Sequence, residues 1–247
     1  MKKYLSIFEL FARNTIYKVL SVLVLMAAVQ TGLFYKTMHA WIPVDLYHVD
    51  FQAIEHYSLE WMVEESKLLW FTGVAFVCIT AILCRNCCNV GSKSSYTIRR
   101  LRVTEKSIFV MQSLYNIACY LLLIGVQTAV LFGLGNYYVQ KAGSVTNQTL
   151  FLAFYRNDFM HSMLPLESMS HWVTNMLIMA GCGVSAAVFT YLSRRGKVAW
   201  SLLVVVVCVV LGYVQELGIQ MNIVTAILTV SIAGITAYCH VLQKKED

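Results

Sequence analysis

Three closely spaced cysteines are the arrangement in this sequence that is nearest to a metal site. Cys84, Cys87 and Cys88 follow an apolar segment, and two cysteines separated by two residues commonly supply half of a structural zinc site. Such a site needs four ligands. The alternation of charge along the chain places only one histidine, His240, on the same side of the membrane as these cysteines. We therefore interpret these residues as free thiols at the membrane edge, and expect no metal or other cofactor.

A second candidate arrangement comprises His171, Asn175, Ser185 and His240. It resembles the Ser–His dyad and oxyanion residues of rhomboid intramembrane proteases. That resemblance requires Asn175 and Ser185 on different helices around one point, whereas one apolar segment carries both, about 15 Å apart along a helix. Ser185 is also followed by Ala186, where the family has Gly. We instead expect a helix-packing surface of small residues: Gly181, Gly183, Ser185, Ala186 and Ala187.

The segments that must position these residues are unusually apolar. The chain is 58% hydrophobic and only 13% charged, whereas a soluble domain has about 45–50% apolar and 25% charged residues. A run of roughly 17–28 apolar residues can cross about 30 Å of hydrocarbon as a helix. We therefore predict an all-α polytopic membrane protein, one transmembrane domain over 1–247, with six transmembrane helices near 19–35, 68–84, 108–135, 172–192, 198–214 and 219–240.

Charge alternates along the chain and predicts its orientation. Most of the 19 basic residues lie before the first apolar segment, after the second, after the fourth or at the C-terminus, and most of the 13 acidic residues lie in the other gaps. Cytoplasmic segments carry an excess of Lys and Arg, so both termini are expected in the cytoplasm. The net charge of +6 is then a topology signal, and no nucleic-acid partner is expected.

Three segments outside the crossings carry helical patterns. Residues 1–18 place Leu5 and Phe8 on one face, which suits an amphipathic interfacial helix or an extension of the first crossing. Residues 50–66 predict an amphipathic helix that runs into the second crossing. The third apolar stretch is expected to continue as one helix from about 96 to 138.

The sequence excludes some energy sources for transport. It has neither a phosphate-binding G-x-x-x-x-G-K-[ST] loop nor a dinucleotide fingerprint, so nucleotide hydrolysis by this chain is not expected. No Asp, Glu, Lys, Arg or His lies near the middle of a crossing, although ion-coupled transporters usually place such residues there. If the chain transports a substrate, the energy must come from another subunit.

Three features together resemble the permease subunits of bacterial type-2 ABC exporters. They are the six crossings, the two cytoplasmic termini and the basic segment S-Y-T-I-R-R-L-R-V-T-E-K-S-I-F-V-M-Q at 95–112. The resemblance implies that this segment is a coupling helix that contacts a cytoplasmic ABC ATPase. It also implies a second permease subunit, identical or paralogous, and places the chain in the lipid of a bacterial plasma membrane. The implied contact residues are Ile98, Arg99, Leu101, Arg102, Val103, Thr104, Glu105 and Lys106.

Two features depart from the family pattern. The family often has short re-entrant helices between its fifth and sixth crossings, where this chain has only a few residues, and here the long aromatic segment is 137–171. We expect a permease that exports a peptide, lipid or drug-like substrate and is not itself an enzyme. The alternatives are a membrane sensor or scaffold without transport activity and, less favoured, a rhomboid-like protease.

Overall fold

The computed structural model describes residues 2–41, 58–85, 103–146, 154–163, 169–197, 200–214 and 218–242. Within these ranges all regular structure is helical, which confirms the all-α prediction. The elements are α1 (Lys2–Trp41), α2 (Leu59–Glu65), α3 (Leu68–Cys84), α5 (Glu105–Thr146), α7 (Asp158–Met163), α8 (Met169–Ser193), α9 (Ser201–Val214), α10 (Gly218–Ala237) and the π-helix η3 (Tyr238–Leu242).

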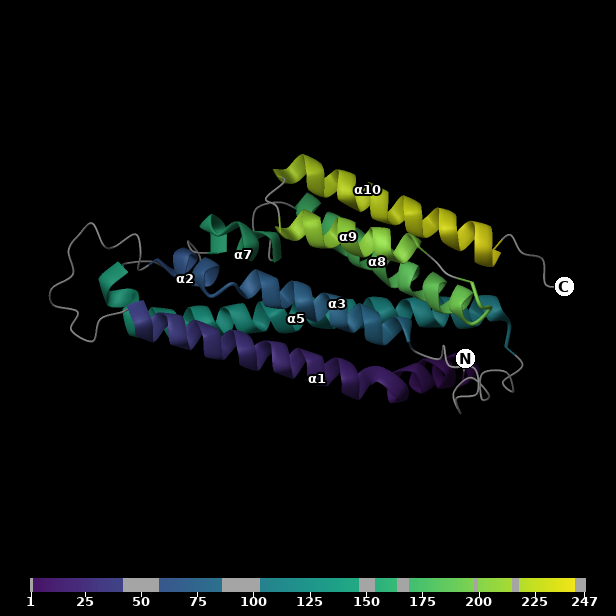
Figure 1. Ribbon diagram of the computed structural model, residues 1–247, viewed down its shortest axis with the longest axis horizontal. Coiled ribbons are helices and arrows are strands. Elements are labelled where there is room, and N and C mark those ends of the chain that lie inside the picture. The colour runs from purple at the N-terminus through teal and green to yellow at the C-terminus, as the bar shows by residue number, and fades with distance from the viewer. Residues whose placement is uncertain are drawn as a thin grey trace.

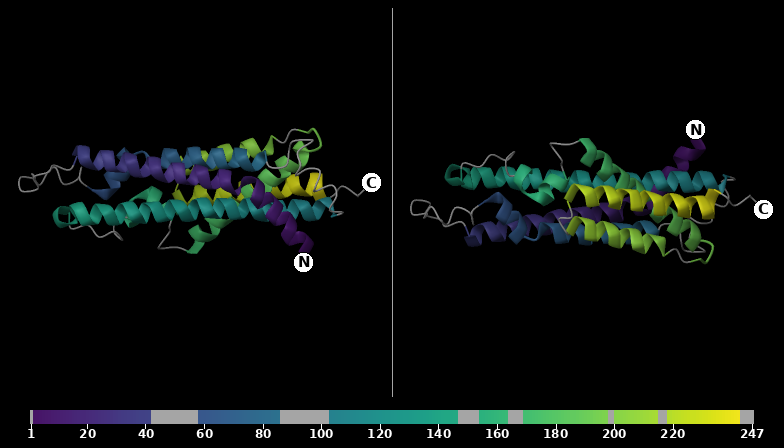
Figure 2. Two further views of the ribbon diagram at one scale, coloured as in Figure 1. Left: turned by 90° about the horizontal axis from the view of Figure 1, so that it is seen from below. Right: turned by 90° about the horizontal axis from the view of Figure 1, so that it is seen from above.

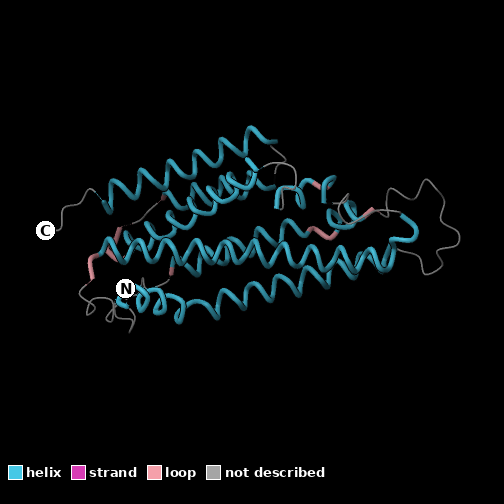
Figure 3. Tube along the Cα trace, turned by 180° about the vertical axis from the view of Figure 1, so that it is seen from behind, coloured by secondary structure: helices cyan, strands magenta, loops and turns pink. Residues whose placement is uncertain are grey.

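The long helices form an elongated bundle with nearly parallel axes (Figure 1). Helices α1, α3 and α5 lie on one side, while α8, α9 and α10 lie on the other, and α8 packs against both α5 and α10. The start of α1 and the end of η3 lie at the same end of the bundle, as the views in Figure 2 and Figure 3 also show. We call this the basic end, because Arg85, Lys106, Arg194 and Arg195 also lie at the helix ends gathered there.

Three helices in the described part of the chain are long and apolar enough to cross a membrane. They are the segments Tyr4–Ala40, Glu105–Lys141 and Met169–Ser193. Helices α2 and α3 pass the same test together, as a pair bent by 50°, which would make a fourth span. The apolar parts of α9 and α10 are shorter, Ser201–Val210 and Ile223–Ala237. Length and composition thus support several membrane spans.

Helix α1 is continuous from Lys2 to Trp41. The expected interfacial segment 1–18 is therefore the first part of α1, not a separate helix, although Figure 2 shows α1 turning near its N-terminal end. The side chains of Ile7 and Phe11 are fully buried. The rings of Phe8 and of Tyr115 on α5 pack edge to face, with their centres 5.5 Å apart. Packing against α5 thus holds one face of this segment to the bundle.

The predicted run of residues 50–66 into the second crossing is interrupted. Ser58 caps α2 by accepting a hydrogen bond from the Trp61 amide, and residues 50–57 lie outside the described part. Between α2 and α3, Lys67 adopts a left-handed backbone conformation with φ 53°. This conformation is unfavourable for a residue with a side chain, and it produces the 50° bend. Helix α3 itself begins and ends where the sequence predicted the second crossing.

The expected helix from about 96 to 138 is displaced along the chain. Helix α5 begins at Glu105, after non-helical Val103 and Thr104, and ends at Thr146. Its 42 residues give a length of about 63 Å, and α1, with 40 residues, is about 60 Å long. Each is about twice as long as the hydrocarbon layer is thick, so both extend beyond it.

The main core is the buried apolar cluster that includes Ile7, Phe11, Tyr115 and Ile178. A second apolar cluster lies toward the other end of α1 and α5, where Figure 1 shows α2 beside them. Asn157 helps to build it, because its side chain accepts a hydrogen bond from the Met160 amide at the start of α7 and donates one to the Glu60 carbonyl of α2. Burial of apolar surface therefore accounts for the extra length of the two long helices. The buried residues of this cluster are Phe34, Met38, Leu59, Met62, Val63, Leu68, Leu131, Leu134, Tyr138, Phe154 and Met160.

Candidate functional site at the basic end of the bundle

Half of the predicted ATPase-contact residues belong to the described structure. Ile98, Arg99, Leu101 and Arg102 lie outside the described residues, while Val103, Thr104, Glu105 and Lys106 lie at the start of α5. Thr104 and Glu105 are exposed and Lys106 is half-buried. Val103 packs against the main core, so it anchors the segment to this chain.

The start of α5 is fixed by ordinary helix-capping chemistry. Thr104 precedes the first helical residue, its carbonyl accepts a hydrogen bond from the Ile108 amide at 3.2 Å, and its hydroxyl pairs with that of Ser107 at 2.9 Å. Threonine is a favoured residue at this position. The carboxylate of Glu105 in the first turn is favourable beside the positive end of the helix dipole. These residues thus present Glu105 at a defined place.

The end of α8 faces Glu105, and Gly196 terminates that helix. Gly196 has a φ of 70°, which costs glycine little. The Lys197 amide donates to the Leu192 carbonyl at 3.0 Å, and the Gly196 amide donates to the Ser193 carbonyl at 3.1 Å. This pair of bonds is the Schellman motif. It holds Arg194 and Arg195, the last residues before the glycine, in fixed positions.

Two arginines then join α8 to α5. The Arg195 guanidinium forms an ion pair with the Glu105 carboxylate and lies 4.4 Å above the centre of the Tyr191 ring. Arg194 donates a hydrogen bond from Nη2 to Oε1 of the buried Gln112 at 3.3 Å. The side chains of Arg195 and Glu105 are 32% and 62% exposed, so water screens their attraction. The contacts serve to align the two helices.

No family model, curated protein or solved structure matches this chain. The site is therefore interpreted from its own geometry. That geometry brings together two segments that lie far apart in the sequence, the start of α5 and the turn after α8. Sequence reasoning identified Glu105 but missed its partner Arg195, even though the pattern Arg194-Arg195-Gly196 is typical of a helix end.

The residues that resemble a protease site are placed differently. His171 and Ser185 both lie on α8, about 21 Å apart along its axis. Ser185 is fully buried and its hydroxyl oxygen has no hydrogen-bond partner. The neighbouring glycines are packing positions: a Cβ atom on Gly183 would lie 2.5 Å from Cγ1 of Ile117 on α5, and one on Gly181 would lie 3.2 Å from Thr229 on α10. The small-residue surface predicted from the sequence is thereby confirmed.

The candidate metal ligands are not gathered in the described residues. Cys84 is buried at the end of α3, while Cys87 and Cys88 lie outside the described part. Among the residues described, no group of three His, Cys, Asp or Glu side chains is arranged to hold a metal ion. His161 of α7 and His171 of α8 lie near each other, with ring centres 6.2 Å apart, a pairing that the sequence did not predict.

Proposed function

We propose that this chain is the permease subunit of a type-2 ABC transporter, in which separate cytoplasmic ATPase subunits bind near 95–106. A second permease subunit, identical or paralogous, would complete the transport path in the plasma membrane. In this proposal all six apolar segments cross the membrane, including the shorter α9 and α10. The basic end faces the cytoplasm, and the substrate is exported.

The helix arrangement supports a six-crossing topology. Along the chain α1, the α2–α3 pair, α5, α8, α9 and α10 alternate in direction, and the start of α1 and the end of η3 lie at one end of the bundle (Figure 1). An even number of crossings requires the first helix to begin and the last helix to end on the same side of the membrane. The basic residues that flank the helices gather at the same end, as expected for the cytoplasmic side.

The observation that carries the proposal is the pair of contacts from the turn after α8 to α5, namely Arg195 to Glu105 and Arg194 to Gln112. A force applied by a partner to the segment before α5 would act on Glu105 directly. The two arginines would pass it on to α8, which packs against α10. A surface loop that served only as a topology anchor would not need to be joined to both sides of the bundle.

The test is to identify an ATPase and to show that it depends on this surface. Full-length tagged chain is purified from membranes of its native host, and an ATPase found with it is co-expressed with the chain and reconstituted in nanodiscs. The expected result is ATP hydrolysis that the chain stimulates. Leu101→Asp should remove both binding and stimulation, since a charge placed in an apolar pocket costs several kcal/mol. Lys93→Asp is the control and should change neither.

Three outcomes decide against the proposal. If no ATPase is retained, the sensor or scaffold alternative replaces it. If Leu101→Asp binds and stimulates the ATPase as the wild type does, the segment is only a topology anchor. If Lys93→Asp is as defective as Leu101→Asp, charge and not the predicted apolar contact explains the loss.

A further inference from the structure

Helices on both sides of the bundle stop at one height along its axis. Figure 1 shows α3, α9 and α10 ending short of α1 and α5, on the side away from the basic end. Contacts between helices define this height. Gly183 of α8 packs against Ile117 of the antiparallel α5. Trp172 lies eleven residues before Gly183, so it is level with Thr128 of α5.

Helix α3 gives the same height through a separate set of contacts. Tyr120 of α5 hydrogen-bonds with Thr80 and packs against Phe76, both on α3. Trp70 lies ten residues before Thr80 and six before Phe76. Since α3 and α5 are antiparallel, Trp70 is level with residues 126–130 of α5. The two tryptophans therefore lie at one height on different sides of the bundle.

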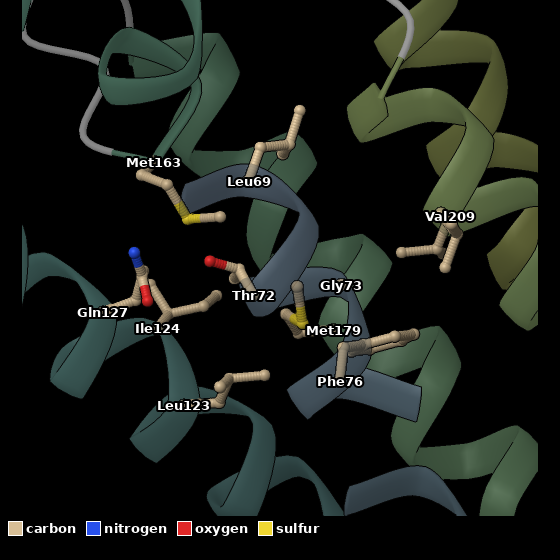
Figure 4. A pocket seen from close by; sticks show the side chains of 11 residues that line it. Leu69, Thr72, Gly73, Phe76, Leu123, Ile124, Gln127, Met163, Met179 and Val209 are labelled. Carbon is tan, nitrogen blue, oxygen red and sulfur yellow. The ribbon is translucent and has the colours of Figure 1, made fainter. Parts of the chain in front are cut away.

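Two further observations agree with this height. Figure 4 shows Leu69, the neighbour of Trp70, around the same small cavity as Gln127 of α5. On α10, Thr229 packs against Gly181 of α8. Helix α10 begins eleven residues before Thr229, which is level with residue 170 of α8. The start of α10 thus lies within two residues of the height of the tryptophans.

The side chains at this height suit the surface of a bilayer. Trp70 and Trp172 are 59% and 36% exposed, and tryptophan is enriched where a membrane meets water. Just beyond Trp70, Lys67 breaks the helix, and Glu64 and Glu65 are exposed. A break exposed to lipid would leave backbone polar groups without partners. The break therefore belongs at or beyond the membrane surface.

Basic residues place the opposite surface of the membrane. Arg85 lies fifteen residues beyond Trp70 on α3, about 23 Å along the axis. Gln30 of α1 donates hydrogen bonds to α3 on both sides of Trp70, and Lys18 lies twelve residues before Gln30, about 18 Å away. Both basic residues are exposed, and such side chains extend about 6 Å toward water. Their charges then lie about 24–29 Å from the tryptophans, close to the ~30 Å thickness of the hydrocarbon layer.

Beyond the height of the tryptophans only part of the bundle continues. Helix α1 extends about 17 Å past Gln30, and α5 about 27 Å past Thr128. There the second apolar cluster buries Leu131 and Leu134 of α5 together with Met62 of α2. Because these side chains already cover one another, this part of α5 does not need lipid around it.

We propose that Trp70 and Trp172 bind the phospholipid headgroup layer of the leaflet farther from the basic end, and that the second apolar cluster stands beyond it in water. An indole ring at this depth places its apolar face among the acyl chains and its polar edge among the headgroups. The proposal requires that the bundle cross a membrane. It does not require that the chain transports a substrate or binds an ATPase.

Tryptophan fluorescence in nanodiscs that contain brominated phosphatidylcholine measures the depth of each ring. Single-tryptophan variants of the full chain keep Trp70 or Trp172 and replace the other tryptophans by Phe. Bromine near the headgroup end of the acyl chain should quench both rings more than bromine near the chain terminus, and to a similar extent. The control keeps only Trp61 of α2, which should be quenched by neither lipid because it lies beyond the bilayer.

A second measurement does not depend on tryptophan. Leu121 and Asn136 are both exposed on α5, about 22 Å apart along its axis. Leu121→Cys and Asn136→Cys, each on a Cys-free background, carry a nitroxide spin label. Oxygen concentrates in lipid, so it should collide with the label at position 121 more often than a water-soluble nickel complex does. At position 136 the ratio of the two collision rates should be reversed.

Each contrary result overturns the proposal. If the label at position 136 prefers oxygen, the bilayer covers the second apolar cluster. If the label at position 121 prefers the nickel complex, the bundle does not cross lipid at this depth. If the deeper bromine quenches Trp70 or Trp172 more strongly, that ring is not at the lipid surface. Should a single-tryptophan variant not fold, the two labels decide alone. Stimulation of an ATPase is measured separately, so none of these results decides the transport proposal.

Discussion

Gly183 is the position at which a single methyl group should be least tolerated among the described glycines. A Cβ atom there would lie 2.5 Å from Cγ1 of Ile117, 3.0 Å from its amide nitrogen and 3.2 Å from its Cα. Carbon atoms in contact normally lie about 3.5–4.0 Å apart. The Ile117 side chain could rotate away, but its backbone could not, so α8 and α5 would have to separate.

The expected magnitude follows from three effects of Gly183→Ala. Overpacking costs about 1–3 kcal/mol. Separation of the helices weakens the hydrogen bond from Asn116 to the Gly183 carbonyl, now 3.2 Å, which is worth about 0.6 kcal/mol in membrane proteins. Higher helix propensity returns about 1 kcal/mol. The free energy of unfolding should therefore fall by roughly 0.6–2.6 kcal/mol.

Unfolding by SDS in mixed micelles, followed by circular dichroism, measures this change. Gly125→Ala on α5 is the matched control, because its added Cβ atom meets nothing within 4 Å, and it should be neutral or slightly stabilising. In a double-mutant cycle, Ile117→Ala should cost less stability in the Gly183→Ala background than in the wild type. It removes the Cγ1 clash but leaves the backbone contacts, so only part of the loss caused by Gly183→Ala is offset. The reasoning is refuted if Gly183→Ala is as stable as Gly125→Ala.

Three further predictions test topology, interior polar contacts and the protease alternative. On a Cys-free background, an impermeant thiol reagent applied from outside should label Tyr155→Cys but not Lys197→Cys, both exposed positions; the reverse pattern contradicts the orientation. A double-mutant cycle of Thr15→Val and Tyr115→Phe, whose hydroxyls lie 2.7 Å apart, should give a coupling of about 0.6 kcal/mol, and zero coupling contradicts the contact. Ser185→Ala removes an unpaired buried hydroxyl and should leave stability unchanged or raise it by about 1 kcal/mol, with no proteolytic activity to lose; an activity that this variant abolishes would favour the rhomboid-like alternative.

The helices could be predicted from the sequence because hydrophobicity and charge are local signals. Helix α3 has the predicted bounds of the second crossing, and α8 extends the predicted segment 172–192 by only a few residues. The small residues Gly181 and Gly183 indicated a packing surface because few other roles suit two glycines in an apolar helix. Their partners Ile117 and Thr229 could not be inferred, since contacts between helices depend on the three-dimensional arrangement.

The predictions that failed concern helix ends and breaks. The start of α5 was placed near 96 because the amphipathic pattern continues there, but Thr104 caps the helix later. The break at Lys67 has no proline or glycine to mark it, because it arises from a left-handed backbone conformation at a lysine. The ion pair of Glu105 with Arg195 joins distant segments. Such a pairing leaves no pattern in a single sequence.

The interior polar groups distinguish the two sides of the bundle. Within the layer of α1, α3 and α5, side chains pair across helices, as in Thr80 with Tyr120 at 2.9 Å. The boundary with α8 has several polar atoms without partners: Gln112 Nε2, Asn116 Oδ1, both polar atoms of Gln127, and Ser185 Oγ. Gln30 Oε1 in the first layer is also unpaired. Close contact at Gly183, the hydrogen bonds from Asn116 to the Gly183 carbonyl and from Arg194 to Gln112, and the Arg195–Glu105 ion pair join the first layer to the second. Since polar atoms left unpaired in an apolar interior favour separation or hydration, we expect the boundary to open before either layer comes apart.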